Sequence, residues 1–170
     1  MVPIRIKNQA DRIAMGSDAA GNKIRKISAS AKDEYMGNLS LFVPKKGKSA
    51  TLQDVRVLKE YRRKGISKNL FKRATDMLER ANKKFLRSDE IMSPAQVKIR
   101  TKYGRYKAGS KRKNRTKFFA DQFGPYGEKT RRVTSKEAIE IIKENKGPYG
   151  TGRRVTATTM IKKLPKKYRK

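Results

Sequence analysis

Apolar and polar residues alternate along four short stretches in the first third of the chain, a pattern typical of half-buried β-strands. These stretches cover residues 3–8, 24–31, 35–44 and 50–58. Pro44 ends the third stretch, and a basic turn containing Gly47 separates it from the fourth. The pattern therefore predicts a set of antiparallel strands at the start of the chain.

From Ser67 onward the apolar residues follow the spacing of a helix. They form one stripe, made of Leu70, Phe71, Ala74, Met77, Leu78 and Ala81. A brief strand is predicted at 84–87, and a second helix begins with Ser93 as N-cap and Pro94 as first helical residue. Gly104 closes this second helix. The elements predict a mixed α/β layer domain over 1–107.

Beyond this domain the chain has a basic linker at 105–117 and an internal repeat. Gly-Pro-Tyr-Gly occurs at 124–127 and 147–150, and Arg-Arg-Val-Thr follows each copy at 131–134 and 153–156. A capping box of Thr134 and Glu137 predicts a helix after the first copy, and a similar but weaker helical pattern follows the second. Residues 108–170 are therefore predicted to be an extended basic C-terminal arm that carries two repeat units.

Each repeat unit places a tyrosine in a Gly-Pro turn beside an arginine pair. The turns would hold Tyr126 and Tyr149 at a set angle, because proline fixes φ and glycine relaxes it. The pairs Arg131-Arg132 and Arg153-Arg154 would grip phosphates or acidic side chains. We expect two docking arms that reach a neighbouring subunit. The alternatives are a tail folded back as a small subdomain and a chance likeness of two turns.

The net charge of the chain predicts a polyanionic partner. Lys and Arg total 46 against 15 Asp and Glu, so the net charge is +31. Residues 110–170 alone carry a net charge of +14. Such an excess repels itself unless a polyanion neutralises it, and nucleic acid bound nonspecifically through its phosphate backbone is the expected partner. A generally basic protein without such a partner is the alternative.

The linker and the repeats supply the expected contacts. These residues are Lys111, Arg112, Lys113, Arg115, Arg131, Arg132, Arg153, Arg154, Tyr126 and Tyr149. No membrane partner is expected, because the sequence offers no basic amphipathic helix with bulky apolar anchors outside the predicted core. Protein assembly partners or self-association are expected as well.

The composition excludes much enzyme chemistry. The chain has no cysteine and no histidine, which excludes thiolate zinc sites, imidazole bases and Ser-His-Asp triads, and no metal site is expected. No run of 18 apolar residues predicts a membrane-spanning helix. The first 13 residues lack the apolar core of a signal peptide, so a cytoplasmic location, or a virion, is expected.

The segment with the most specific chemistry lies between the fourth strand and the first helix. It reads Arg62-Arg63-Lys64-Gly65-Ile66-Ser67. A glycine-containing strand-to-helix turn exposes backbone N–H groups at the positive end of a helix, which forms an anion site suited to a pyrophosphate. Gly65 permits a close approach of the backbone, and the three basic side chains add positive charge.

Residues 54–104 resemble the core of the GNAT superfamily, the GCN5-related N-acetyltransferases. The loop at 62–67 is similar to the family's Arg/Gln-x-x-Gly-x-Gly/Ala acetyl-CoA loop, and 93–104 is similar to its Asn-Pro-Ala-Ala helix. The runs at 52–66 and 87–93 resemble bacteriophage-encoded members. The resemblance implies an α/β fold of the α+β type with a mixed sheet and an acetyl-CoA cofactor held by 62–67. It does not extend over 110–170.

The departures from the family pattern concern catalysis. Ser67 replaces the last small residue of the loop, and Arg100 stands where the family commonly has the tyrosine that protonates the leaving thiolate. An arginine is not a general acid near neutral pH. The family's helices after the first strand have no counterpart in the pattern of 9–23. Asp54, as a buried general base, and Tyr103 are the remaining candidate catalytic residues, and strand-end pairing and helix packing are their ordinary explanations.

Three functions therefore stay open. The first is a catalytically degenerate GNAT-fold protein repurposed for nucleic-acid association or assembly, such as a phage virion component near packaged DNA. The second is an active acetyl-CoA-dependent N-acetyltransferase that acts on a protein or small amine. The third is a ribosome-associated RNA-binding protein. Fold alone does not decide among them.

Overall fold

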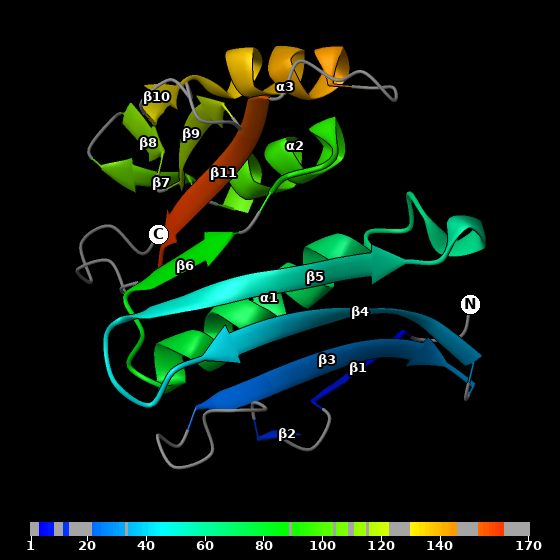
Figure 1. Cartoon of the computed structure of the whole chain (residues 1–170). Helices are drawn as coiled ribbons and strands as arrows, with labels where there is room; N and C mark the ends of the chain where they lie inside the picture. The colour runs from blue at the N-terminus through cyan, green and yellow to red at the C-terminus, as the bar shows by residue number, and fades with distance from the viewer. Residues whose placement is uncertain are drawn as a thin grey trace. The chain divides into compact units, whose positions relative to one another are not determined.

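A computed structural model shows two compact units, Met1–Leu86 and Arg87–Lys170 (Figure 1). The structure describes residues 4–8, 12–13, 22–32, 34–88, 90–103, 105–108, 111–114, 116–122, 130–145 and 153–161. The predicted domain end at residue 107 lies within the second unit. Mixed α/β architecture is confirmed in both units.

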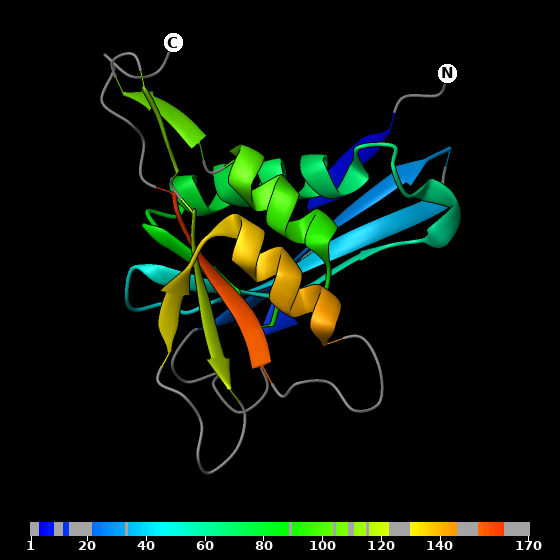
Figure 2. The ribbon, with the colours of Figure 1, turned by 90° about the horizontal axis from the view of Figure 1, so that it is seen from above.

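The first unit is an antiparallel sheet with one helix on a face. Its strands run in the order β1 (Arg5–Asn8), β3 (Lys23–Ala31), β4 (Glu34–Val43) and β5 (Ser49–Val57), and β2 (Arg12–Ile13) also pairs with β3. The short 3-10 turn η2 (Lys59–Tyr61) leads from β5 toward α1 (Ile66–Arg80). Figure 2 shows α1 lying across this sheet. The four predicted strands and the first predicted helix are confirmed.

A β-bulge explains why the apolar pattern of β5 changes phase. Leu41 pairs with Leu52 and Ser40 with Asp54, so Gln53 is an extra residue in β5. Leu52 and Val55 consequently lie on the same face of the sheet, although they are three residues apart. This face packs against α1, and Asp54 is placed on the opposite face.

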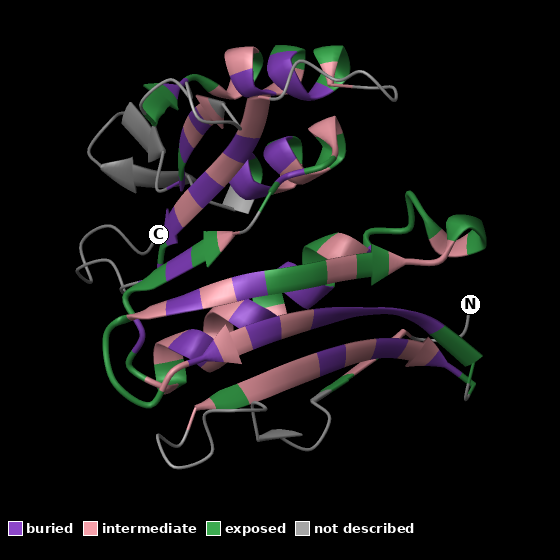
Figure 3. Ribbon diagram, in the orientation of Figure 1, coloured by how far each residue is buried: buried purple, intermediate pink, exposed green. Residues whose placement is uncertain are grey.

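The core of the first unit joins this sheet face to the stripe on α1. Its buried residues include Ile27, Ala29, Leu39, Leu41 and Leu52 from the strands and Ile66, Leu70, Phe71, Ala74 and Leu78 from the helix. Figure 3 shows the resulting alternation of buried and less buried positions along the strands. Gly37 lies where β4 crosses close to β5, because a Cβ there would approach the Arg56 carbonyl oxygen to 2.4 Å.

The second unit has its own sheet and core. The sheet order is β11 (Arg153–Met160), β9 (Thr116–Gln122) and β10 (Arg131–Val133), with both outer strands antiparallel to β9. The helices are α2 (Pro94–Tyr103) and α3 (Ser135–Glu144), and β6 (Phe85–Ser88) crosses the boundary between the units. The buried cluster contains Ile91, Val97, Phe118, Ala120, Val133, Ala138, Ile141, Ile142, Val155 and Ala157.

The cap predictions for both helices of this unit are confirmed. The Gln96 amide donates to the Ser93 hydroxyl at 3.4 Å at the start of α2. The Glu137 amide donates to the Thr134 hydroxyl at 3.1 Å at the start of α3. These hydroxyls satisfy N–H groups that a helix leaves unbonded at its first turn.

Three predictions for the C-terminal part are wrong. The segment expected to be a linker contains a hairpin of β7 (Arg105–Ala108) and β8 (Lys111–Asn114). The weak helical pattern of the second repeat is strand β11, where the β-branched residues of Val-Thr-Ala-Thr-Thr favour an extended backbone. Where the structure describes it, the chain from Thr116 to Ile161 packs into a core with Ile91 and Val97, so it is not an extended arm.

None of the helices that the structure describes is both long enough and apolar enough to span a bilayer.

Lys83 fastens the turn between β4 and β5, which gives a first testable prediction. Its side chain is only 7% exposed, and its ammonium donates to the Pro44 carbonyl at 2.5 Å and the Gly47 carbonyl at 3.0 Å. Lys83→Met should lower the free energy of unfolding by about 1–3 kcal/mol, because both carbonyls lose their partner. Chemical denaturation measures this loss. Lys84→Met is the matched control on an exposed neighbour and should change stability by no more than about 0.5 kcal/mol.

Candidate functional site

The predicted anion-binding loop lies in the first unit, between β5 and α1. Gly65 is the N-cap of α1 with φ +76°, and Arg63 also has a positive φ of +65°. No side chain caps this helix, so its first N–H groups lack both an intrahelical and a side-chain partner. A Cβ at Gly65 would meet no atom within 4 Å, so the space before the helix terminus is open.

Three side chains hold the loop in place. The Tyr61 hydroxyl donates to the Glu34 carboxylate at the start of β4, and the Arg62 Nε donates to the Val57 carbonyl at 3.2 Å. The Lys64 ammonium lies 5.1 Å from the centre of the Tyr61 ring. The loop is therefore braced against both β4 and β5. Sequence analysis missed Glu34, because 27 residues separate it from its partner.

The predicted cofactor residues divide into two roles. Ile66 is buried and anchors the helix in the core, and Ser67 is half-buried. Arg62, Arg63, Lys64 and Gly65 are exposed around the helix terminus. Positive φ angles, open space and exposed cations together form a site that fits a pyrophosphate, such as that of coenzyme A.

The sheet face opposite α1 carries the candidate base Asp54. Asp54 is exposed and pairs across the strands with Ser40, so it lacks the burial that the general-base hypothesis required. Tyr35, which sequence analysis did not select, lies close enough to feel both Asp54 and Arg56. Desolvation raises the pKa of Tyr35 most, the Arg56 charge lowers it, and the Asp54 charge raises it. A phenol with a raised pKa is a weak acid at neutral pH.

Arg100 is a buried cation of the second unit. It lies on α2 with only 3% of its surface exposed, and desolvation lowers its pKa to about 10. It therefore remains protonated at neutral pH and cannot deliver a proton as the family tyrosine does. The backbone of Tyr103 belongs to the same helix, one turn further on, and its side chain lies outside the described residues.

The arginine pairs of the two repeats lie on either side of β9. Val133 pairs with Phe118 and Val155 with Ala120, so the two Arg-Arg-Val segments flank β9 with an offset of two residues. Arg131 forms an ion pair with Glu137 at 2.6 Å, and Arg154 forms one with Asp121 at 2.8 Å. One member of each pair is thus bound within the chain, whereas Arg132 is exposed and Arg153 is half-buried.

Several predicted contact residues lie outside the described part of the chain. These are Arg115, Tyr126 and Tyr149, together with the side chains of Lys111, Arg112 and Lys113, whose backbone forms β8. The predicted use of the two Gly-Pro-Tyr-Gly turns stays a prediction.

Solved structures with similar folds are GNAT acetyltransferases. The chain is 14% identical to the IAA acetyltransferase from Bacillus cereus, with a TM-score of 0.58, over 93% of this chain and 99% of that one. It is 13% identical to a GNAT family acetyltransferase from Elizabethkingia anophelis with acetyl-CoA bound, with a TM-score of 0.53, over 92% and 97%. The ribosomal-protein-S18-alanine N-acetyltransferase from Escherichia coli is 14% identical, with a TM-score of 0.51, over 83% and 71%.

These likenesses show a GNAT acetyltransferase fold. A match over 93% of the chain includes most of residues 110–170, which the sequence resemblance did not reach. The chain spans only 32% of a tandem GNAT protein from the clavulanic acid biosynthesis pathway. No family model and no curated protein matches the chain.

Gly65 supplies the test of the loop. Gly65→Ala should weaken coenzyme A binding by about tenfold or more, because a methyl group enters the open space in front of the helix and a left-handed φ becomes strained. Titration calorimetry measures the affinity. Gly47→Ala is the matched control, because Gly47 also has a positive φ of +83° and open space at its Cβ. Equal coenzyme A binding by the two variants would contradict the assignment.

The Tyr61–Glu34 brace gives a spectroscopic prediction. The hydrogen bond to Glu34, more than desolvation or the Glu34 charge, raises the pKa of Tyr61 to about 12. Because this lies above the ordinary value of 10, the brace contributes stability below pH 10 and loses it as the pH rises through 12. Ultraviolet titration should show a tyrosine step near pH 12 that Tyr61→Phe removes and Tyr35→Phe retains. A step that survives in Tyr61→Phe would refute the brace.

Proposed function

We propose that this chain is a GNAT-fold protein repurposed to bind the phosphate backbone of nucleic acid, with little or no acetyl transfer. The observation that carries the proposal is the charge balance. The chain has 46 basic and 15 acidic residues, so its cations outnumber its carboxylates by 31. Counterion release from a polyanion is the strongest source of binding energy for such a surface. Packaged DNA in a phage particle would be a partner of this kind.

Loss of efficient transfer is supported by Arg100, which stands where the GNAT pattern commonly has a proton-donating tyrosine, and by Asp54, the candidate base. Arg100 is charged and buried at the position of the usual tyrosine. Asp54 is exposed and therefore lacks the burial that the general-base hypothesis required. The loop at 62–67 nevertheless fits the pyrophosphate of coenzyme A, which would supply an acetyl thioester when bound. Binding of the coenzyme without turnover is the expected behaviour.

An active N-acetyltransferase is the second candidate, and the loop geometry favours it. An uncapped helix terminus with Gly65 in the left-handed region is what a pyrophosphate requires. Acetyl-CoA is bound in the Elizabethkingia anophelis protein of similar fold, and the Escherichia coli neighbour is an acetyltransferase for an alanine of ribosomal protein S18. A protein amine would be the corresponding acceptor here.

One experiment with two readouts separates these candidates. Fluorescence anisotropy of the full chain with a 30-base-pair DNA duplex is measured over a salt series, and release of coenzyme A from acetyl-CoA is followed with a thiol reagent. The chain has no cysteine, so the reagent reports only the coenzyme. We expect the logarithm of the affinity to fall with a slope of about −4 or steeper against the logarithm of salt, as five or more phosphate contacts require.

Release of coenzyme A should stay at the rate without protein, with polylysine as the acceptor amine. Turnover above this rate together with a shallow salt slope would overturn the proposal and favour the enzyme. A steep slope with single-stranded RNA and a shallow one with the duplex would favour the ribosome-associated alternative.

A further inference from the structure

A cleft of about 290 Å³ opens at the C-terminal end of α1 in the first unit. It is lined by Arg25 from β3, by Arg73, Met77 and Arg80 from α1, and by Ala81. The lining residues of the helix side run from Arg73 to Ala81, about 12 to 24 Å along the helix axis from Gly65, and none of them belongs to the loop at 62–67. The cleft is therefore separate from the candidate coenzyme site. Met77 and Ala81 give it an apolar surface between three guanidinium groups.

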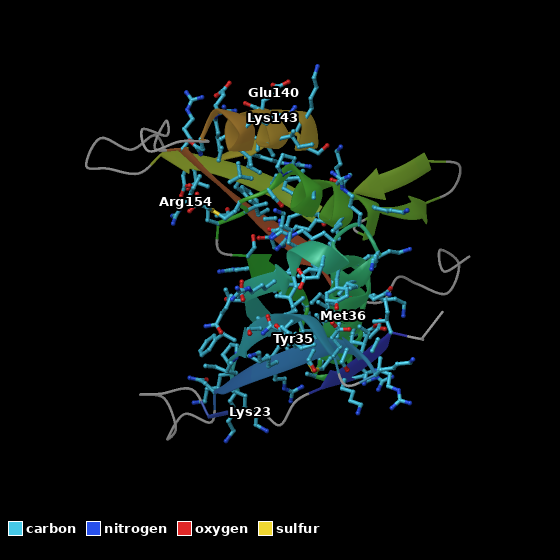
Figure 4. All side chains as sticks on the ribbon, turned by 90° about the vertical axis from the view of Figure 1, so that its right-hand side faces the viewer. Lys23, Tyr35, Met36, Glu140, Lys143 and Arg154 are labelled. Carbon is cyan, nitrogen blue, oxygen red and sulfur yellow. The ribbon has the colours of Figure 1, made fainter. Side chains whose placement is uncertain are left out.

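More cations surround this end of the first unit. The turn between β4 and β5 carries Lys45, Lys46 and Lys48, all of them exposed. Lys23 pairs with Val43 beside that turn, and the Lys45 amide donates to the Asn22 side chain at 3.2 Å. Figure 4 labels Lys23 beside the strands of the first unit. The three arginines thus lie within a larger basic surface.

The pKa of Lys83 reports the same positive field. It is lowered by desolvation first and then by the charges of Lys48 and Arg25. Lys83 is buried against the turn that carries Lys48, and Arg25 lines the cleft. Lys48 and Arg25 are therefore both close enough to Lys83 to act on its charge, which links the basic turn with the cleft.

Stabilisation of the helix dipole does not explain this arrangement. Favourable interaction of a cation with a helix C-terminus is limited to the last turn, and Arg80 alone satisfies that condition. Arg73 lies two turns earlier, and Arg25 lies on a strand. Arginines from separate elements converge here on one cleft.

We propose that this arginine cleft, formed by Arg25, Arg73 and Arg80, binds phosphate groups of a nucleic-acid backbone. The inference rests on the proposed function and assigns the contact to the folded first unit. A guanidinium group can donate two parallel hydrogen bonds to one phosphate. The exposed side chains of Lys45, Lys46 and Lys48 beside the cleft would contact neighbouring phosphates of the same strand. The apolar floor allows the sugar edges to approach.

The test compares two double variants of the full chain that lose the same charge. Arg73→Gln with Arg80→Gln removes two cations of the cleft, and Lys68→Gln with Lys72→Gln removes two exposed cations of the same helix. Affinity for the 30-base-pair duplex is measured over the salt series. The cleft variant should lower the magnitude of the slope by about 2, one for each lost phosphate contact, and the lysine variant should change it by less than about 1.

The charge-conserving double variant Arg73→Lys with Arg80→Lys is the control for a loss of folding. This variant should keep the salt slope but weaken binding several-fold, because lysine cannot make the bidentate contact of a guanidinium with a phosphate. Thermal melts confirm that each variant folds. Equal slopes for the cleft and lysine variants would overturn the cleft while leaving the proposed function intact, because wild type still binds.

Absence of binding by wild type would overturn both. Polyglutamate of matched charge is the competing probe. In one outcome, polyglutamate displaces the wild-type chain from labelled DNA as effectively as unlabelled DNA does, yet fails to displace the cleft variant. In that case the cleft binds an acidic protein, and the nucleic-acid assignment is wrong.

Discussion

The structure depends on burying few apolar residues in a chain with 31 excess positive charges. Each unit builds its core between one face of its sheet and the apolar side of the helices that cover it. In the first unit α1 covers β3, β4 and β5, and in the second unit α2 and α3 cover β9 and β11. Apart from the buried Lys83 and Arg100, the charged residues that the structure describes lie mainly on the opposite sheet face, the turns and the outer helix surfaces. A polyanion that neutralises this surface would relieve the charge repulsion that destabilises the compact state.

Local patterns predicted the elements well and their contacts poorly. The spacing of apolar residues predicts the strands and α1. Pro94 and the Thr134 hydroxyl mark the first turns of α2 and α3. All of these signals act over only a few residues. The bulge at Gln53 and the pairing of Tyr61 with Glu34 depend on strand register, which no short stretch encodes. The second repeat shows the same limit, because its partner strand β9, and not its own weak helical pattern, decides that β11 is extended.

The candidate site shows what a motif can and cannot specify. Gly65 and the following helix were predictable, because a positive φ and a helix terminus are local properties. The environments of Asp54, a candidate base, and of Arg100, at the position of the usual tyrosine, were not, because burial depends on tertiary packing. Asp54 turned out exposed and Arg100 buried, the reverse of what a base on a strand and a charged helix residue would lead one to expect. The arginines of the cleft come from β3 and α1, 48 residues or more apart, and only the fold brings them together.

The two Arg-Arg-Val segments that flank β9 make the second unit ambiguous during folding. Both run antiparallel to the same strand, and each places its valine in the same core. Early in folding either segment can therefore occupy either edge of β9 with nearly equal backbone bonding. Only the residues that follow distinguish the two outcomes: the capping threonine and α3 in one case, and the β-branched run of β11 in the other. An exchange of the two segments would therefore be a kinetic trap, and the internal repeat would slow the search for the native topology.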